Sequence, residues 1–376
     1  MSGLPAYELI LWLIFSLFAI VTLVQLLYYW LIFSRLAFFN KQDKIYNKQP
    51  VSVVICARND YSNLRRNLPM ILEQDYPEFE VVVVNDGSDD ETSFLLKGFA
   101  ETYPRLSIVT ISENLNFFSG KKFPLSIGIK SAKYDVLLLT DADCRPASPL
   151  WITLMQSNFV DKKEIVLGYG GYETRPGILN KLIRFDTLFV AMQYLSYALA
   201  GVPYMGVGRN LSYRKSLFYK TKGFISHYRI RSGDDDLFVN GVARRLNTRI
   251  EISHESHTIS EPKTNFNEWV RQKQRHFSTG KLYKPKHKML LSGFIVTQFM
   301  FYLLFIMLLP SLYNIYYVMA LFGLRMFSAL FIHKKCMAKL AEKNLLLYLP
   351  LFELFFILFN PILSLTASIS KQHKWK

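Results

Sequence analysis

Short apolar runs alternate with amphipathic stretches in the first part of the chain. Four runs rich in Val, Ile and Leu have the length of buried strands: Val51–Cys56, Phe79–Val84, Leu106–Ile111 and Leu137–Thr140. The stretches between them have the spacing of helices: Tyr61–Glu73, Glu91–Tyr103 and Pro124–Ala132. Strands and helices that alternate in this way form βαβ units with right-handed crossovers. The pattern therefore predicts an α/β domain with a mostly parallel sheet.

Much longer apolar segments lie near the two ends of the chain. Leu9–Ser34 contains no charged residue and exceeds the ~20 residues that a helix needs to cross a bilayer. Met289–Leu324 is also uncharged, but it is too long for one crossing. Pro310 offers a break between two predicted spans, Met289–Leu309 and Leu312–Ile332. The soluble domain is thus predicted to lie between membrane segments.

A last apolar segment, Leu345–Ile369, contains Glu353 and several helix breakers. Basic residues follow the first span, so the positive-inside rule places the soluble domain in the cytoplasm, at the inner membrane if the cell is bacterial. Four full spans would leave the basic tail, residues 371–376, on the outer side. An interfacial or re-entrant last segment would avoid this, so two or three C-terminal spans remain open. Arg325 falls inside a predicted span, where its charge is costly unless the side chain snorkels to the interface or pairs.

These patterns divide the chain into four parts. They are an N-terminal transmembrane helix at residues 1–34, a basic linker at 35–50, a cytoplasmic domain at 51–284 and a C-terminal membrane region at 285–376. A large soluble domain with so few spans argues against a transporter or channel.

The chain is strongly basic, with a net charge of +16. Such a balance suits nucleic acid, anionic lipids or phosphorylated substrates. Because no arginine-rich arm or nucleic-acid motif is present, we expect membrane lipids and phosphates, and no nucleic acid, as partners. Cys56, Cys144 and Cys336 have no metal-ligand spacing and predict no disulfide framework.

Two acids follow the fourth predicted strand. Asp141 and Asp143 are separated by one small residue in the stretch LLLTDADC. Open α/β sheets bind ligands at the carboxyl ends of their strands, and Mg²⁺ or Mn²⁺ prefers carboxylate and phosphate oxygens. The pair is a candidate for holding a metal diphosphate, and the alternative is a solvated turn.

Polar residues also end the first two strands. Asp86 is placed to accept hydrogen bonds from a base or ribose, although Ser88 or Asp89 could simply cap the next helix there. The first strand ends in Ala57-Arg58-Asn59-Asp60. Because strand ends of a parallel sheet meet at one edge, we expect these residues to share a nucleotide site with Asp141.

Lys121 and Lys122 follow Gly120 without the GxxxxGK[ST] pattern of a P-loop. A lysine here, with Lys122 as the candidate, could reach a diphosphate. The alternative is a solvated basic loop.

Three adjacent acids, Asp234, Asp235 and Asp236, precede an apolar run. Acids are favoured at a helix N-terminus by the helix dipole. A carboxylate that is partly desolvated beside another acid also has a raised pKa, which suits a general base.

Gln272 and Arg275 lie three apart and would share one face of a helix. Arg275 could neutralise a departing diphosphate. The alternative for this basic segment is binding to anionic lipid headgroups. We interpret His254 and His257 as structural.

The stretches described so far resemble the membrane-anchored glycosyltransferases of family 2, which are inverting enzymes of the GT-A type. The resemblance covers roughly Val51–Gly280 and rests on VSVVICARND, VVVVNDGSDDET, GKKFPLSIGIKSAKYDVLLLTDADC, GDDDL and QxxR. It implies an α/β, Rossmann-like GT-A domain flanked by transmembrane helices. It also implies a nucleotide-diphospho-sugar donor, a UDP-sugar first of all, and a lipid-linked or polysaccharide acceptor.

The resemblance also implies roles for the acids. Asp86 would hold the nucleotide, and Asp141 and Asp143 would meet Mg²⁺ or Mn²⁺ on the diphosphate. Asp234 would deprotonate the acceptor hydroxyl. Asp235 stays a rival, because Gly233 stands where the family often has Glu.

The last element matches the QxxRW motif of the processive members, with Gln272 and Arg275 as its polar residues. His276 replaces the Trp, which leaves repeated or single sugar addition open. The expected reaction is a single displacement that inverts the anomeric carbon. The alternative is a membrane-anchored nucleotide sensor that does no chemistry.

Overall fold

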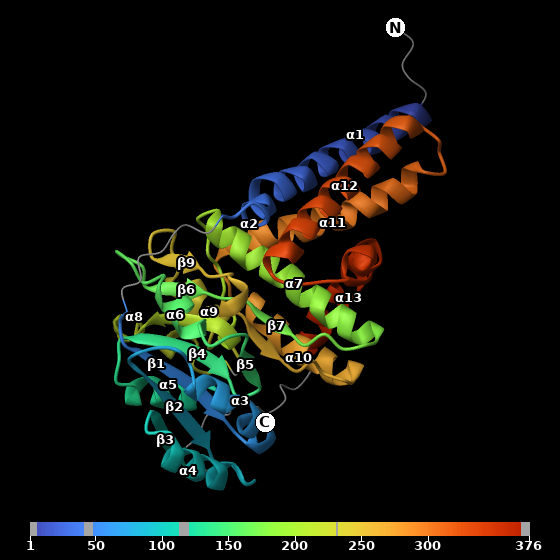
Figure 1. Ribbon diagram of the computed structural model, residues 1–376. Helices are drawn as coiled ribbons and strands as arrows, with labels where there is room; N and C mark the ends of the chain where they lie inside the picture. The colour runs from blue at the N-terminus through green and yellow to red at the C-terminus, as the bar shows by residue number, and fades with distance from the viewer. Residues whose placement is uncertain (1–5, 41–47, 113–119, 231, 370–376) are drawn as a thin grey trace.

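The computed structural model of the protein describes residues 6–40, 48–112, 120–230 and 232–369. Within these ranges, an α/β domain joins a group of long helices (Figure 1). The sequence prediction of an α/β domain with flanking apolar helices is confirmed.

A seven-stranded mixed sheet forms the centre of the α/β domain, in the order β3-β2-β1-β4-β8-β6-β9. Its strands are β1 (Val51–Ala57), β2 (Phe79–Asp86), β3 (Leu106–Ile111), β4 (Val136–Asp141), β6 (Ile165–Leu167), β8 (Leu211–Arg214) and β9 (Thr248–Ile250). Strand β8 runs antiparallel to its neighbours β4 and β6, and the other neighbouring pairs are parallel. In this register Cys56 pairs with both Val84 and Asp141, so β1, β2 and β4 end at one edge.

Helices cover both faces of the sheet because its strands are apolar on both sides. Val53 and Ile55 pack in one core with α3 (Tyr61–Leu72), α4 (Thr92–Thr102) and α6 (Trp151–Gln156). Val54 and Val82 pack in the other core. That core also includes side chains of α5 (Lys122–Ser131) and α7 (Ile178–Leu199).

Smaller elements complete the edge at which β1, β2 and β4 end. A three-stranded sheet has the order β5-β10-β7, formed by Cys144–Pro146, Thr258–Ser260 and Gly170–Tyr172. Helix α9 (Asp236–Val242) begins at the last of the three adjacent acids, and α10 (Phe266–Gly280) contains the QxxR residues. The short helices α8 (Lys215–Lys220) and α2 (Ser34–Ala37) each add buried side chains to the core that contains α5 and α7.

Four segments are long and apolar enough to cross a membrane: residues 6–37, 285–308, 315–339 and 346–366. They contain α1 (Ala6–Leu27), α11 (Pro285–Leu308), α12 (Ile315–Lys339) and α13 (Leu349–Ile369). A π-helical turn, Tyr28–Phe33, joins α1 to α2. Figure 1 shows α1, α11 and α12 side by side, whereas α13 has a different direction and lies beside α10.

Two buried charged residues inside the apolar helices, Arg325 and Glu353, form an ion pair. Arg325 of α12 donates to Glu353 of α13 at 2.6 Å and to Gln25 of α1 at 3.1 Å. The hydroxyls of Tyr29 and Tyr302 also donate to Glu353, at 3.0 and 2.7 Å. Of the two alternatives for Arg325, the structure shows pairing rather than snorkelling.

Close packing of α5 on the sheet yields a stability prediction. A Cβ at Gly128 would lie 2.7 Å from Val54 Cγ1 and 2.8 Å from Val84 Cγ2, too close for any real contact. Gly128→Ala should therefore lower the free energy of unfolding by about 1–3 kcal/mol, as overpacked cores do. Thermal unfolding of the purified protein in detergent measures this.

Gly98 of α4 supplies the matched control, because a Cβ there meets nothing within 4 Å. Gly98→Ala should leave stability unchanged or raise it by up to ~1 kcal/mol through helix propensity. Equal melting temperatures for the two variants would contradict the packing of α5.

Candidate functional site

The loops after β1 and β2 are tied to each other at the carboxyl edge of the sheet. The Asn59 backbone N–H donates to Ser88 Oγ at 3.0 Å, and the Asn59 side chain accepts from the Asp89 N–H at 2.8 Å. Asn59 has a left-handed backbone, with φ of 51°, which asparagine adopts more readily than most residues. Ser88 thus joins the two loops, and the capping bond to the Thr92 N–H comes from Asp90 at 3.0 Å.

The predicted nucleotide residues lie around this junction. Ala57 is the last residue of β1, with Arg58 directly after it. Asp86 ends β2 and is 2% exposed. Asp60 precedes α3 and accepts from Asn63 at 2.9 Å. The strand register thus brings the ends of β1 and β2 together beside Asp141, as expected from a parallel sheet.

Lys121 links two of the predicted acids. Its Nζ forms an ion pair with Asp141 and lies 3.8 Å from Asp234 Oδ2. Burial alone would lower the pKa of Lys121, but the charges of Asp141 and Asp234 raise it well above its usual value. Burial would likewise raise the pKa of Asp141, and Lys121 holds it below the usual range. Both groups are therefore charged at neutral pH.

Asp141 and Asp143 are suited to hold a hard divalent cation. A carboxylate oxygen of each and Cys144 Sγ lie within 4.8 Å of one another. Burial raises the pKa of the Cys144 thiol well above its usual value, so this sulfur stays a neutral, poor ligand. Desolvation and the charge of Asp141 raise the pKa of Asp143, which a bound cation would reverse. The two oxygen donors fit Mg²⁺ or Mn²⁺.

The Lys122 side chain does not bond to Asp141 or Asp143. Its Nζ donates to the backbone carbonyls of His227, Ile230 and Ser232 at 2.8, 2.7 and 2.6 Å. These contacts argue against its predicted role at a diphosphate, which its neighbour Lys121 is better placed to fill. Successive residues at the start of a helix point ~100° apart, so only one of the two lysines can face the acids. Lys122 instead anchors the loop that leads to Asp234.

The three acids of the GDDDL stretch have different surroundings. Asp235 accepts from the backbone N–H groups of Asp236 and Gly208, both at 2.7 Å, and caps α9. Asp236 accepts from the Thr279 hydroxyl and from the Tyr283 hydroxyl, the latter at 2.7 Å. Burial and the neighbouring acids raise the pKa of Asp235 to about 7. Asp234 differs because its charged neighbour is Lys121.

Helix α10 brings the QxxR residues to the same region. Gln272 Nε2 donates to the Tyr172 hydroxyl at 3.2 Å. Arg275 is exposed and is close enough to lower the pKa of Asp141 by its charge. Arg275 is therefore within electrostatic range of Asp141, and Gln272 contacts the tyrosine on which Arg209 stacks.

Sequence reasoning missed Arg209. Its guanidinium lies 4.4 Å from the centre of the Tyr172 ring, and Nη1 donates at 3.4 Å to Gly171 O and to Ser260 Oγ. The charges of Asp141 and Asp143 help raise the pKa of Arg209 against the effect of burial. Arg209 belongs to a three-residue 3-10 turn, Gly208–Asn210. Such a turn has no periodic pattern, so no sequence signal marked it.

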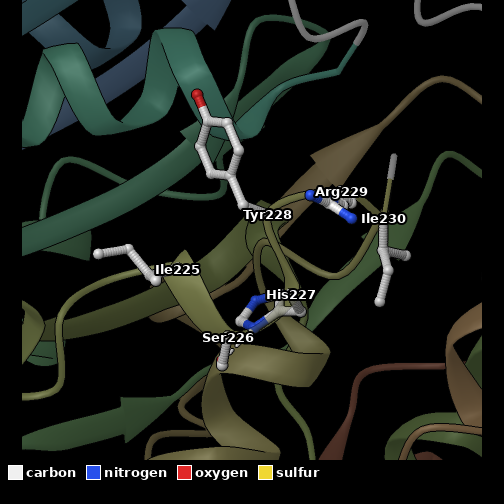
Figure 2. Close-up of a pocket in the computed structure, with 6 residues that line it drawn as sticks. All are labelled: Ile225, Ser226, His227, Tyr228, Arg229 and Ile230. Atoms are coloured by element: carbon white, nitrogen blue, oxygen red, sulfur yellow. Dashed lines mark hydrogen bonds between the residues drawn. The ribbon is translucent and has the colours of Figure 1, made fainter.

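Two cavities are lined by residues other than these acids. One of about 300 Å³ is bounded by residues 225–230, the loop that holds Lys122, with Tyr228 and His227 on opposite sides of it (Figure 2). The other, about 820 Å³, lies along β9 and the ends of α2, α7 and α12. The predicted acids line neither cavity, and they lie instead at the carboxyl edge of the sheet.

The lysine contacts predict different outcomes for two adjacent substitutions. Lys121→Met removes a cation from Asp141, so Mn²⁺ should bind roughly tenfold more tightly, given the strength of such charge pairs. Lys122→Met should leave Mn²⁺ affinity unchanged but lower stability by about 1–3 kcal/mol, because three buried carbonyls lose their donor. Mn²⁺ titration followed by electron paramagnetic resonance, with thermal unfolding in parallel, measures both. Equal Mn²⁺ affinity in the wild type and Lys121→Met would contradict this account of Asp141.

Known proteins share both the sequence and the fold of this region. Residues 52–230 match the family model described as glycosyl transferase family 2. The probable glycosyltransferase YdaM of Bacillus subtilis is 27% identical over 185 residues, which cover 46% of this chain and 42% of that protein. The poly-beta-1,6-N-acetyl-D-glucosamine synthase of Staphylococcus epidermidis is 29% identical over 126 residues, 31% of this chain and 29% of the synthase. The chain thus spans less than half the length of these relatives.

A solved structure resembles nearly the whole chain. The mannosyltransferase PcManGT from Pyrobaculum calidifontis, in complex with GDP-Man and Mn²⁺, superimposes with a TM-score of 0.58 over 92% of this chain and 98% of that one. Its sequence identity is 19%, so the likeness concerns the fold. The GT-A fold prediction is confirmed, and the predicted resemblance to glycosyl transferase family 2 is confirmed over residues 52–230, just under half of the chain.

Proposed function

We propose that the protein is a membrane-bound inverting glycosyltransferase, which moves a sugar from a nucleotide-diphospho-sugar to a hydroxyl of a lipid-linked or polysaccharide acceptor. The observation that carries this proposal is the Lys121 cluster, in which Asp141, Asp143 and Asp234 meet at the carboxyl edge of a family 2 domain. This arrangement supports a metal-phosphate site with a candidate base beside it.

The donor would bind at the ends of β1, β2 and β4. Asp86 and the Ala57–Asn59 segment line the nucleotide side, and Asp141 and Asp143 would hold Mg²⁺ or Mn²⁺. The ion, when bound, neutralises charge on the diphosphate. A UDP-sugar is our first candidate as donor. The mannosyltransferase of the same fold holds GDP-Man and Mn²⁺, so both nucleotides belong in any screen.

Asp234 is the best candidate for the general base. Asp235 and Asp236 are engaged in bonds that hold α9 to its neighbours, whereas Asp234 faces Lys121. A carboxylate there would take the proton of the acceptor hydroxyl as its oxygen attacks the anomeric carbon. One displacement inverts the configuration, and the nucleoside diphosphate leaves.

Cations surround the position of the leaving group. Arg275, Lys121 and Arg209 all interact electrostatically with Asp141, so their charges reach the diphosphate that the metal acids would hold. Positive charge placed in advance stabilises the negative charge that develops as the bond to the sugar breaks. Gln272 would help by holding Tyr172, on which Arg209 stacks.

The long apolar helices would keep this site at a membrane surface. Four segments are suited to cross a bilayer, and the positive-inside rule favours a cytoplasmic site. A lipid-linked acceptor would then meet the site without leaving the membrane. Contacts with membrane lipids follow from the same placement.

The proposed base yields a test that separates an enzyme from a nucleotide sensor. Asp234→Asn should lower turnover by roughly 10²–10⁴-fold, the usual contribution of a general base, while donor affinity changes little. The assay measures nucleotide release from a panel of UDP- and GDP-sugars with membrane-embedded protein and Mn²⁺. Unaltered nucleotide binding with no turnover in the wild type would favour the sensor.

Asp135 supplies a matched control, because it pairs with Arg214 at 3.0 Å and has a side chain that is 46% exposed. Asp135→Asn should keep turnover within about twofold, since exposed ion pairs contribute little. Asp235→Asn should mainly destabilise the protein, because an amide oxygen cannot replace both bonds of the capping carboxylate. Full turnover in Asp234→Asn with loss in Asp235→Asn would transfer the role to Asp235.

Metal dependence gives a separate prediction. Chelation by EDTA should abolish nucleotide release, and added Mn²⁺ or Mg²⁺ should restore it. Asp143→Ala should show the same loss without restoration, because one of two protein oxygen ligands is gone. Turnover that persists in EDTA would remove the metal from the proposal and leave the cationic residues to hold the diphosphate.

A further inference from the structure

Helix α10 lies between the candidate site and the apolar helix α13. Its Trp269 ring stacks on Phe359 of α13, with ring centres 5.5 Å apart, and Phe266 contacts the same phenylalanine at 5.9 Å. Gln274 Nε2 donates to Thr366 Oγ1 of α13 at 3.1 Å. Apolar packing and a hydrogen bond therefore hold one side of α10 against α13.

Arg275 lies on the side of α10 opposite Phe266, and Gln272 lies between Arg275 and Trp269 around the helix. Phe266 and Arg275 are nine positions apart, which corresponds to about 180° around a helix with ~100° per residue. Gln272 reaches the Tyr172 hydroxyl at 3.2 Å, and Tyr172 lies under Arg209. A helix moves as a rigid unit over this length, so a shift of its Phe266 side displaces the Arg275 side as well.

A buried ion pair fixes α13 in turn. Arg325 is 0% exposed and Glu353 is 4% exposed. Two hydrogen bonds between their side chains, at 2.6 and 3.3 Å, join α12 to α13. Glu353 comes three residues before Phe356, and Phe356 packs on Trp269 of α10. The hydroxyls of Tyr29 and Tyr302 converge on the same carboxylate. The first turns of α13 are thus tied to α1, α11 and α12.

Such a pair is poorly explained by stability alone. Desolvation of two charges offsets much of their attraction, and apolar replacements of buried pairs are often neutral or stabilising. Arg325 Nε also has no hydrogen-bond partner in the described part of the chain. A bidentate pair does, however, define one orientation between two helices, which apolar contacts define less sharply.

We propose that Arg325 and Glu353 are positioning residues for the transferase site: they orient α13, α13 holds α10, and α10 places Gln272 and Arg275. The inference rests on the proposed function for its catalytic consequence, but the mechanical connection from Glu353 to α10 does not. Substrates do not contact the pair, which acts at a distance through packed helices.

Glu353→Gln tests this connection by removing the charge at nearly constant shape. The nucleotide-release assay in lipid nanodiscs should show turnover lowered by roughly ten- to a hundredfold, as small misplacements of catalytic groups do. The KM for the donor should stay within about twofold, because the strand-end residues that would bind the nucleotide do not contact α13. A loss of folded protein alone would also leave KM unchanged, so turnover is expressed per active site, counted by donor binding; a loss that came only from unfolding would then disappear.

A second measurement reads the helix contact directly. The side chains of Gln274 and Thr366 are hydrogen-bonded. In the double variant Gln274→Cys/Thr366→Cys with Glu353 unchanged, a short bis-methanethiosulfonate should therefore join the two new cysteines. Adding Glu353→Gln should slow this cross-linking several-fold. Cys56, Cys144 and Cys336 are buried, and the single-cysteine variants correct for their reaction.

Gln25→Leu is the control on the α1 side, because it removes the 3.1 Å bond to Arg325 and the bonds to Phe294 O and Thr297 Oγ1 of α11, but no bond to α13. Turnover and cross-linking should there equal those of the wild type. The double variant Arg325→Leu/Glu353→Leu guards against misfolding, since it leaves no unpaired buried charge; it should fold and still lose turnover and cross-linking.

The outcomes separate the two proposals. An inactive wild type with Glu353-dependent cross-linking would reject the transferase assignment but keep the helix connection. An active wild type whose turnover and cross-linking survive both Glu353→Gln and the double leucine variant would overturn the positioning role.

Discussion

The ion pair of Lys121 with Asp141, extended toward Asp234, is the contact on which the candidate site depends. It joins the end of β4 to the segment before α9, two regions far apart in the chain. Carboxylates gathered this closely repel one another unless a positive charge lies between them. The pKa of Lys121 is raised and that of Asp141 is lowered, so each partner stabilises the charged form of the other. A divalent cation on Asp141 and Asp143 would compete for the same carboxylate, so metal binding and the position of Lys121 are coupled.

The sheet supplies the geometry that this charge balance requires. Cys56, Val84 and Asp141 lie level across three parallel strands, and Asp86 and the Asn59 turn follow directly. Buried β-branched residues on both faces fix this register, because a one-residue slip would exchange the two cores. Strand ends cannot move independently under such packing. The strand-end part of the candidate site is therefore held by the packing of both cores.

Sequence patterns were sufficient to place the half of the site formed by strand ends. They were insufficient to place the half formed by loops and helix starts. Strands with long apolar runs end where the runs end, so Asp86 and Asp141 could be placed from the sequence. Lys121 and Lys122 are adjacent, and only the direction of each side chain at the start of α5 separates a site lysine from one bound to three carbonyls. Asp234, Asp235 and Asp236 differ through partners at Gly208 and Tyr283, which are distant in sequence. Arg209 lies in a short turn whose direction is set by tertiary contacts alone.

The two halves also differ in what holds them. The acids of the strand ends depend on the core of the α/β domain, whereas Gln272 and Arg275 depend on α10. Helix α10 in turn packs on α7 through Lys273 and Asp186, at 2.7 Å, and on the apolar helix α13. Donor binding and leaving-group stabilisation therefore rest on different supports. On the proposed role of Arg325 and Glu353, a change in the apolar helices would reach the second support without disturbing the first, and a bilayer around these helices would then help to shape the site.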